Sequence, residues 1–351
     1  MAGFSEVLGQ EHIKEHFQRA VQRRRVAHAY LIEGEEGMGK RMVARAAAMA
    51  IQCERQDGFA CGECLSCRQM MTGKQPDVRE IVHEKPNVLK IDEVREQLVQ
   101  DMPVRPYANA HKIYIVPDAD KMNPQAQNAI LKTIEEPPPY GIIFLLVKNR
   151  FLMTETVRSR CVKMTLHPLS DAVIVDYLMQ KCGVTDYRAE EVAAFAGGNL
   201  GKAVRLANGD GFFELKNKVV SVMKKLPKLS DWETEGEAKN ITQQKEDIPE
   251  FLNLCELWFR DVLYVKSAGD VSGVHFTEEK ELLKQYAENE SWRGIQENLE
   301  RIAEERVRIS SNVNTDAGME LMLMGMKDGM KDENIKAGYV SEKERRNWRN
   351  G

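Results

Sequence analysis

A glycine-rich segment with one lysine is the first stretch of the sequence whose residue types could do chemistry. Gly34, Gly39 and Lys40 satisfy the spacing Gly-x-x-x-x-Gly-Lys of a phosphate-binding loop, and Gly37 lies between them. In such a loop, backbone N–H groups hold phosphate oxygens and the lysine adds a positive charge. The next position, where a serine or threonine hydroxyl should contact Mg²⁺, is Arg41. The segment therefore predicts a nucleotide loop that lacks one part of its chemistry.

The second NTPase motif is expected where an apolar strand ends in acidic residues. Residues 112–116 read as that strand, and Pro117 and Asp118 follow it. In working enzymes an aspartate at the first of these positions holds Mg²⁺, and an adjacent glutamate often orients the attacking water. Proline cannot ligate a metal. The nucleotide site therefore lacks a second part of its chemistry, so ATP or ADP binding stays possible while hydrolysis is not expected.

Four cysteines follow the helix that the loop begins. Cys53, Cys61, Cys64 and Cys67 are spaced C-x7-C-x2-C-x2-C, and four thiolates this close can form a closed, tetrahedral Zn²⁺ site. Such a site would be structural because no coordination position is left for water. The alternative, a redox Cys-x-x-Cys, would use two cysteines rather than four, in a thioredoxin-like context. We therefore predict a structural zinc module at residues 53–67.

A third pattern, near the N-terminus, matches a zinc-peptidase string. His12 and His16 stand one helical turn apart with Glu15 before the second, which is the order H-x-x-E-H of inverted zinc peptidases. The string lies on a polar helix face and has no obvious third acidic ligand. Because strings this short match by chance, we do not assign a peptidase function to it.

Composition limits the class of protein. Lys and Arg number 50 against 54 for Asp and Glu, a near-neutral balance that neither proves nor excludes a nucleic-acid partner. The N-terminus lacks a basic region followed by an apolar one, and the longest clean apolar run, residues 142–147, is too short to span a bilayer. Clustered cysteines suit a reducing compartment better than a disulfide framework. We expect a soluble, cytoplasmic protein without membrane contact.

The elements that must position these residues alternate between strand and helix. Apolar strands at 27–32, 112–116 and 141–147 are separated by helices at 41–52 and 123–136, an order that predicts a parallel α/β sheet. A boundary falls at residues 167–170. Beyond it the spacing of apolar residues predicts helices only, followed by a charged tail.

With these motifs in place, the chain resembles the clamp-loader subunits of bacterial DNA polymerase III, which are members of the AAA+ class. The resemblance covers about half of the chain. It rests on the strings 7–10, 128–138 and 159–161, the phosphate loop, and the four-cysteine insertion after the helix of the loop.

The resemblance implies a domain organisation. Residues 1–166 would form an AAA+ nucleotide-binding-like domain that carries the zinc module. Residues 167–207 would form a helical lid domain, and residues 208–331 a helical collar domain through which subunits oligomerise. Residues 332–351 would be a charged tail, which we expect to be disordered.

The resemblance also implies a role for Arg160, in the string Ser-Arg-Cys. It would be an arginine finger that acts in trans, in the ATP site of a neighbouring motor subunit, because a guanidinium stays charged and can hydrogen-bond developing phosphoryl charge. The alternative is a surface arginine paired with a carboxylate. Active loaders carry a sensor arginine where this chain has Gly201. With Arg41 and Pro117, three positions of the nucleotide site therefore lack the residue that active loaders carry there.

These departures favour a non-hydrolysing stator over an ATP-hydrolysing motor subunit of the same machine, which is the alternative. The implied partners are the motor subunits, the clamp-opening subunit, the sliding clamp and, through the assembly, primer–template DNA. The chain itself would have no ATPase activity. The nucleotidyltransferase activity of the polymerase holoenzyme would lie in another subunit.

Overall fold

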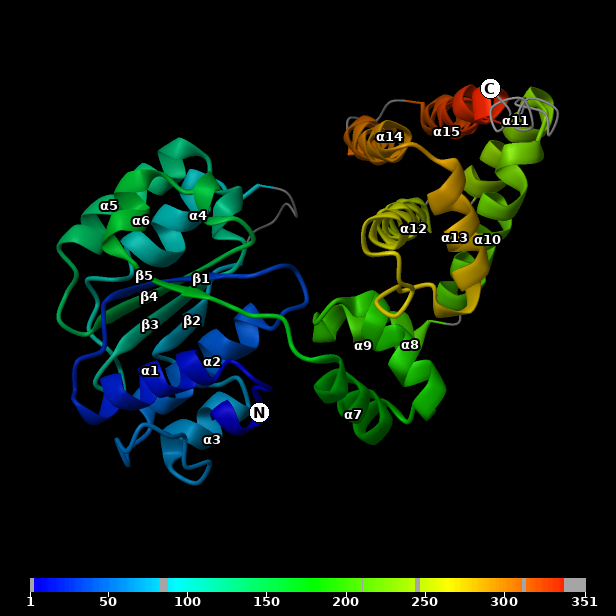
Figure 1. The fold of residues 1–351 in the computed structure, drawn as a ribbon. Helices are drawn as coiled ribbons and strands as arrows, with labels where there is room; N and C mark the ends of the chain where they lie inside the picture. The colour runs from blue at the N-terminus through cyan, green and yellow to red at the C-terminus, as the bar shows by residue number, and fades with distance from the viewer. Residues whose placement is uncertain (1–2, 83–87, 210, 244–246, 311–313, 338–351) are drawn as a thin grey trace, which may run out of the picture. The chain divides into compact units, whose positions relative to one another are not determined.

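A parallel five-stranded sheet lies in the first of the two units of the chain, Met1–Asn208 and Gly209–Gly351 (Figure 1). The computed structural model describes residues 3–82, 88–209, 211–243, 247–310 and 314–337. The strand order is β2-β3-β4-β1-β5. The strands are β1 (Ala29–Glu33), β2 (Val78–Glu80), β3 (Lys112–Val116), β4 (Gly141–Val147) and β5 (Val162–Thr165).

The central strands are apolar on both faces. Every residue of β3 and β4 is buried, and the two strands pair in parallel with Ile113 opposite Ile142. Such strands read as continuous runs of Val, Ile and Leu because helices cover both sides of a parallel sheet. The edge strands β2 and β5 are shorter and only partly buried, which suits strands that lack a neighbour on one side.

Helices cover each face of the sheet and give the unit two hydrophobic cores (Figure 1). One core contains Phe17 and Val43, and the other contains Leu98, Ile130 and Val157. The helices on the first face are α1 (Glu11–Gln22), α2 (Lys40–Gln52) and α3 (Leu65–Met71). Those on the second face are α4 (Ile91–Val94), the π-helical turn η2 (Arg95–Val99), α5 (Pro124–Glu135) and α6 (Glu155–Arg160).

Local signals in the sequence set the ends of α5, the helix that leads toward the Arg160 region. The Asn123 side chain accepts a hydrogen bond from the Ala126 N–H at 2.8 Å, and Pro124 occupies the first helical position. Both are preferred there because the first N–H groups of a helix have no partner within it. The helix ends at Glu135, before three prolines, since a proline disfavours helical backbone in the residue that precedes it.

Three helices complete the first unit, and they pack on one another. The helices are α7 (Asp171–Cys182), α8 (Asp186–Ala196) and α9 (Leu200–Asn208). Short 3-10 turns also occur in this unit: η1 (Gly3–Glu6), η3 (Ala119–Lys121) and η4 (Arg150–Leu152).

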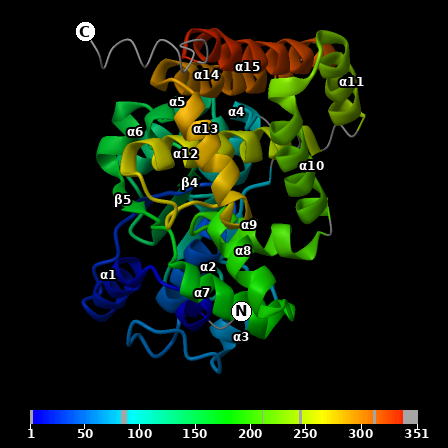
Figure 2. The same cartoon turned by 45° about the vertical axis from the view of Figure 1, so that its right-hand side comes forward.

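The second unit is helical throughout its described part, and α14 lies beside α15 (Figure 2). Its core includes the apolar stripe of α12, where Phe251, Trp258 and Phe259 are fully buried. The helices are α10 (Gly211–Lys225), α11 (Asp231–Thr242), α12 (Ile248–Ala268), α13 (Lys280–Asn289), α14 (Trp292–Ser310) and α15 (Thr315–Ala337), with 3-10 turns η5 (Leu226–Lys228) and η7 (Thr277–Glu279).

The predicted architecture is confirmed: a parallel α/β domain with a four-cysteine insertion, followed by helices. One boundary differs. The expected tail began at residue 332, whereas α15 continues to Ala337, because residues 331–337 contain helix formers and neither proline nor glycine. The rest of the expected tail, residues 338–351, lies outside the described residues.

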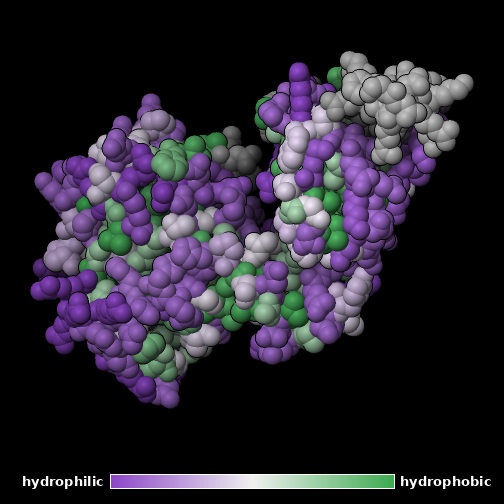
Figure 3. Space-filling model, viewed as in Figure 1, coloured by the Kyte–Doolittle hydropathy of each residue, from purple (hydrophilic) through white to green (hydrophobic). Residues whose placement is uncertain are grey.

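Among the described residues, none of the helices combines the length and the hydropathy needed to cross a bilayer. The face of the molecule in Figure 3 is largely hydrophilic, with small hydrophobic areas between the charged residues.

Candidate functional site

The glycine-rich loop joins β1 to α2, as a phosphate loop requires, but its lysine is engaged within the loop. The Lys40 Nζ donates hydrogen bonds to the carbonyl oxygens of Gly34, at 2.6 Å, and Glu35, at 3.1 Å. Burial lowers the pKa of Lys40, against the opposing effect of nearby carboxylates that include Asp118. The Lys40 ammonium, which is expected to bind phosphate, is therefore hydrogen-bonded to carbonyl oxygens of its own loop.

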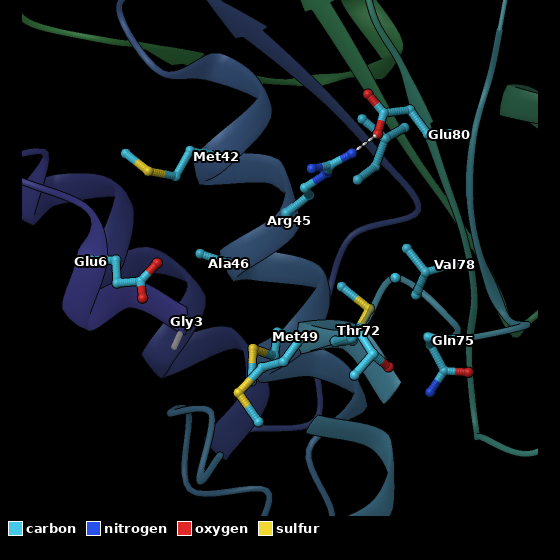
Figure 4. A pocket seen from close by; sticks show the side chains of 14 residues that line it. Gly3, Glu6, Met42, Arg45, Ala46, Met49, Thr72, Gln75, Val78 and Glu80 are labelled. Atoms are coloured by element: carbon cyan, nitrogen blue, oxygen red, sulfur yellow. Dashed lines mark hydrogen bonds and ion pairs between the residues drawn. The ribbon is translucent and has the colours of Figure 1, made fainter. Parts of the chain in front are cut away.

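Arg41 stands where the Mg²⁺-binding hydroxyl should be, and it forms an ion pair with Glu80 at the end of β2. Arg45, one turn further along α2, pairs with the other oxygen of the same carboxylate (Figure 4). Sequence reasoning missed Glu80. The available signal was the i, i+4 spacing of the two arginines, which places two like charges on one helix face, where an acidic partner offsets their repulsion.

A cavity of about 520 Å³ lies beside the loop and contains the positions of the second NTPase motif. Pro117 lines it and offers no ligand atom. Asp118, next in sequence, has a left-handed backbone with φ of 49° and pairs with Lys121 at 3.1 Å. The lining includes Gly37, Gly39 and Lys40, so the structure brings the predicted loop and the positions of the second motif together.

The N-terminal end of α9 rests directly on the loop. The Gly201 N–H donates to the Gly37 carbonyl at 3.0 Å, and the Asn199 Nδ2 donates to the Glu36 carbonyl at 2.7 Å. A Cβ at Gly201 would lie 2.6 Å from the Gly37 oxygen, closer than any non-bonded contact allows. No side chain, and so no sensor arginine, fits at this position without displacing the loop. Sequence reasoning found Gly201 but missed the Asn199 contact.

The four predicted cysteine ligands meet in one cluster. Cys53 caps the end of α2, Cys67 lies in α3, and Cys61 and Cys64 come from the turns between them. All four Sγ atoms lie within 4.8 Å of one another, and Cys61 and Cys67 are 3.9 Å apart. Sulfurs around tetrahedral Zn²⁺ would be separated by about 3.8 Å, given a Zn–S bond of about 2.3 Å. The residues therefore fit a zinc ion.

Backbone groups around the cluster suit thiolates. The N–H groups of Cys64 and Glu63 point at the Cys61 Sγ from 3.3 and 3.4 Å, and they lower the pKa of Cys61 to about 6. Burial acts in the opposite direction and raises the pKa of Cys53 and Cys67. A bound cation offsets this cost because it stabilises the deprotonated form of every ligand. The donor set can therefore hold a metal ion.

A second cavity, of about 400 Å³, lies between η1, α2, α3 and β2 (Figure 4). Met42 and Met49 on α2 and Met70 and Met71 on α3 contribute to its lining. Its position next to the cysteine module was not predicted, because it depends on how α3 packs against α2.

Arg160 is the last residue of α6, on the face of the sheet opposite α2. Its Nη2 lies 2.9 Å from the Glu135 Oε1 at the end of α5, and its Nη1 donates to the Thr156 carbonyl at 3.0 Å. The side chain retains 39% of its exposure. In this chain by itself, Arg160 is thus a half-exposed arginine paired with a carboxylate, and it is separated by the sheet from the helix that carries Lys40.

The residues of the peptidase-like string do not converge. The His12 ring stacks on His167, with ring centroids 4.5 Å apart, whereas His16 packs edge-on against Tyr30. Glu15 pairs with an arginine on its own helix. Within the described part of the chain, the four cysteines are the one group of three or more potential ligands close enough to share a metal.

Comparison with known proteins agrees with these features. Residues 9–170 match the family described as DNA polymerase III, delta subunit. The chain is 26% identical to DNA polymerase III subunit delta' of Bacillus subtilis over 88% of this chain and 94% of that protein. It is 33% identical to subunit delta' of Pseudomonas aeruginosa, over 58% of this chain and 62% of the relative.

Other clamp-loader subunits match as well. The tau subunit of Bacillus subtilis is 28% identical over 77% of this chain and 52% of its own length. A solved structure, the DNA polymerase III gamma subunit-related protein of Thermotoga maritima, aligns over 91% of this chain and 99% of its own, with 19% identity and a TM-score of 0.45. By its sequence matches, the chain is similar to the clamp-loader subunits of DNA polymerase III.

Proposed function

We propose that this chain is the delta-prime subunit of its clamp loader: a stator that does not hydrolyse ATP and that supplies Arg160 in trans to a neighbouring ATPase subunit. The observation that carries the first half is the contact between Gly201 and Gly37. It fills the space in which a sensor side chain would reach the nucleotide.

The other contacts of the loop support the same reading. Arg41 is held by Glu80, so the position next to Lys40 supplies a guanidinium in an ion pair instead of a hydroxyl for Mg²⁺. Pro117 removes the second metal contact. Restoring any one of these parts would leave the others missing. A nucleotide could occupy the 520 Å³ cavity without being hydrolysed, because the groups that bind Mg²⁺ and stabilise the charge that develops in phosphoryl transfer are absent from it.

The second half of the proposal rests on the exposure and chemistry of Arg160. A half-exposed guanidinium at the end of a short helix can reach an anion on another chain once its own carboxylate partner is displaced, whereas Lys40 of the loop is engaged with backbone carbonyls. An arginine supplied in trans contributes about 10³- to 10⁵-fold in rate in well-studied NTPases. The partners would be the motor subunits, the clamp-opening subunit, the sliding clamp and primer–template DNA.

Reconstitution with the motor subunits tests the role of Arg160. Arg160→Ala should lower the ATPase rate stimulated by clamp and primed DNA, while the assembly still forms, as followed by size-exclusion chromatography. Lys163→Ala, which removes an exposed cation on the adjacent strand β5, is the matched control and should leave the rate unchanged. Equal rates for Arg160→Ala and wild type would exclude the finger role.

The alternative function is an ATP-hydrolysing motor subunit, which the preserved loop spacing and the adjacent cavity favour. The isolated chain distinguishes the two. Multiple-turnover hydrolysis of Mg²⁺–ATP that is lost on Lys40→Ala would establish a motor and exclude the stator. We expect no hydrolysis above a no-protein control.

We also propose that the four cysteines hold a structural Zn²⁺ ion. Protein purified without chelator should contain about one zinc per chain by elemental analysis, and Cys67→Ser should lose it. Cys255→Ser, at a buried cysteine in α12 outside the cluster, is the control and should retain the metal. Absence of zinc from the wild-type chain would contradict the assignment.

A further inference from the structure

The Arg160 guanidinium has both of its terminal nitrogens engaged inside the chain. Nη2 meets the Glu135 carboxylate at 2.9 Å, and Nη1 donates to the Thr156 carbonyl at 3.0 Å and to the Ser159 hydroxyl at 3.4 Å. Any phosphate that takes hydrogen bonds from the ends of this fork must compete with these oxygens. The carboxylate is the strongest competitor because it is the charged one.

The position of Glu135 is not explained by the helix that carries it. It is the last residue of α5, where the exposed carbonyls make the helix end partially negative and disfavour a carboxylate. Arg160 is the last residue of α6, and there a cation is favourable. In the Arg160–Glu135 pair, the Arg160 cation from the end of α6 therefore offsets the unfavourable negative charge of Glu135 at the end of α5. The side chains are 39% and 41% exposed, so the pair is accessible to an incoming anion.

We propose that Glu135 is a positioning residue that holds Arg160 in the ion pair against α5, the parked state, until the neighbouring subunit presents a nucleotide phosphate. The proposal rests on the trans-acting role of Arg160 proposed above and adds its regulation. The phosphate displaces the carboxylate from Nη2 by anion exchange, and no covalent bond changes. Glu135 thereby keeps the ATPase rate of the neighbouring subunit low until clamp and DNA bring the two subunits into the catalytic arrangement.

The exposure of the pair determines how large the effect should be. Double-mutant measurements on exposed ion pairs give about 0.2 to 1 kcal/mol, which converts to about 1.4- to 5-fold in the ratio of parked to released arginine. Glu135→Gln keeps the size of the side chain and removes its charge. It should raise the basal ATPase rate of the reconstituted assembly by about 1.4- to 5-fold. The rate stimulated by clamp and DNA should change less, since the finger is already engaged there.

The next residue offers a matched control. Glu136 has an exposed side chain without an ion-pair partner in the described part of the chain. Glu136→Gln removes the same charge one position away and should leave the basal rate unchanged. Thermal unfolding of both variants should follow that of the wild type closely, which checks that folding is intact.

The decisive arm is the double variant Glu135→Gln with Arg160→Ala. If Glu135 acts through Arg160, the double variant should have the same basal rate as Arg160→Ala alone. A rise of the same size in both backgrounds, a fall of the basal rate on Glu135→Gln, or an equal rise with Glu136→Gln would each overturn the parking role. If Arg160 is not an arginine finger, Arg160→Ala leaves the stimulated ATPase rate unchanged. That result identifies failure of the proposed function separately, and it also removes the parking role, which depends on the finger.

Discussion

The loop of this chain and its Arg160 region both present cations near the sheet, but they hold them differently. Lys40 and Arg41 contact the carbonyls of Gly34 and Glu35 and the carboxylate of Glu80. Arg160 keeps an exposed side chain and one carboxylate partner. Lys40 is engaged with the backbone carbonyls of its own loop, whereas Arg160 lies in an exposed ion pair whose carboxylate an anion from another chain could replace.

This difference shows how contacts within the chain can hold a loop of the nucleotide-binding type. Contacts such as Gly201 with Gly37 stabilise the loop in one arrangement, so the glycines remain necessary for the backbone. The following predictions test the contrast, in order of decreasing effect.

The largest effect is expected at Arg160. Arg160→Lys keeps a positive charge but loses the planar fork of donors that binds phosphate oxygens. We expect the stimulated ATPase rate of the reconstituted assembly to fall by at least about 10²-fold, close to the alanine variant. Steady-state kinetics should place the loss in kcat. A lysine variant with nearly full activity would show that charge alone suffices.

A smaller effect is expected where α9 meets the loop. Gly201→Ala would place a Cβ 2.6 Å from the Gly37 oxygen and 2.7 Å from its Cα. Such overpacking costs about 1 to 3 kcal/mol of folding free energy, which denaturant unfolding of the first unit would measure. As the control, Gly236→Ala in the exposed middle of α11 meets no atom within 4 Å. It should stabilise the chain by up to about 1 kcal/mol, and similar destabilisation at both sites would refute the close contact.

A still smaller effect is expected at Arg41. Arg41→Thr restores the hydroxyl of a complete phosphate loop and breaks the ion pair with Glu80. Because the arginine is 58% exposed, the cost should be no more than about 1 kcal/mol. The isolated chain should still not hydrolyse ATP, since Pro117 and Gly201 are unchanged. Hydrolysis gained by this one substitution would contradict the view that several parts fail together.

The smallest effect is expected from the titration of Lys40, which should change the free energy of unfolding only slightly with pH. Burial lowers its pKa from the ordinary value of 10.5, so near pH 10 the unfolded chain binds more protons at this site than the folded chain does. Stability should therefore rise with pH through the lowered pKa and level off above about pH 10.4. Lys40→Met should lack this rise when both proteins are unfolded by denaturant across that range. An identical pH profile would show that the ammonium is fully solvated.

The sequence predicted the parts of the molecule that depend on neighbours along the chain. The spacing of the cysteines, the apolar runs of β3 and β4, and the helix expected at residues 123–136 are local patterns, and the structure contains each of them. The substitutions at Arg41, Pro117 and Gly201 were equally visible, because the motif defines which residue each position should hold.

Partners distant in sequence could not be predicted in this way. Glu80 meets Arg41 only because β2 lies at the edge of the sheet next to α2, and Asn199 reaches Glu36 only because α9 folds back onto the loop. Glu135 meets Arg160 because α5 and α6 end side by side. Sequence alone therefore determined which groups could do chemistry. The tertiary structure decided which of them are engaged, because hydrogen bonds and ion pairs depend on distances that only packing brings within reach.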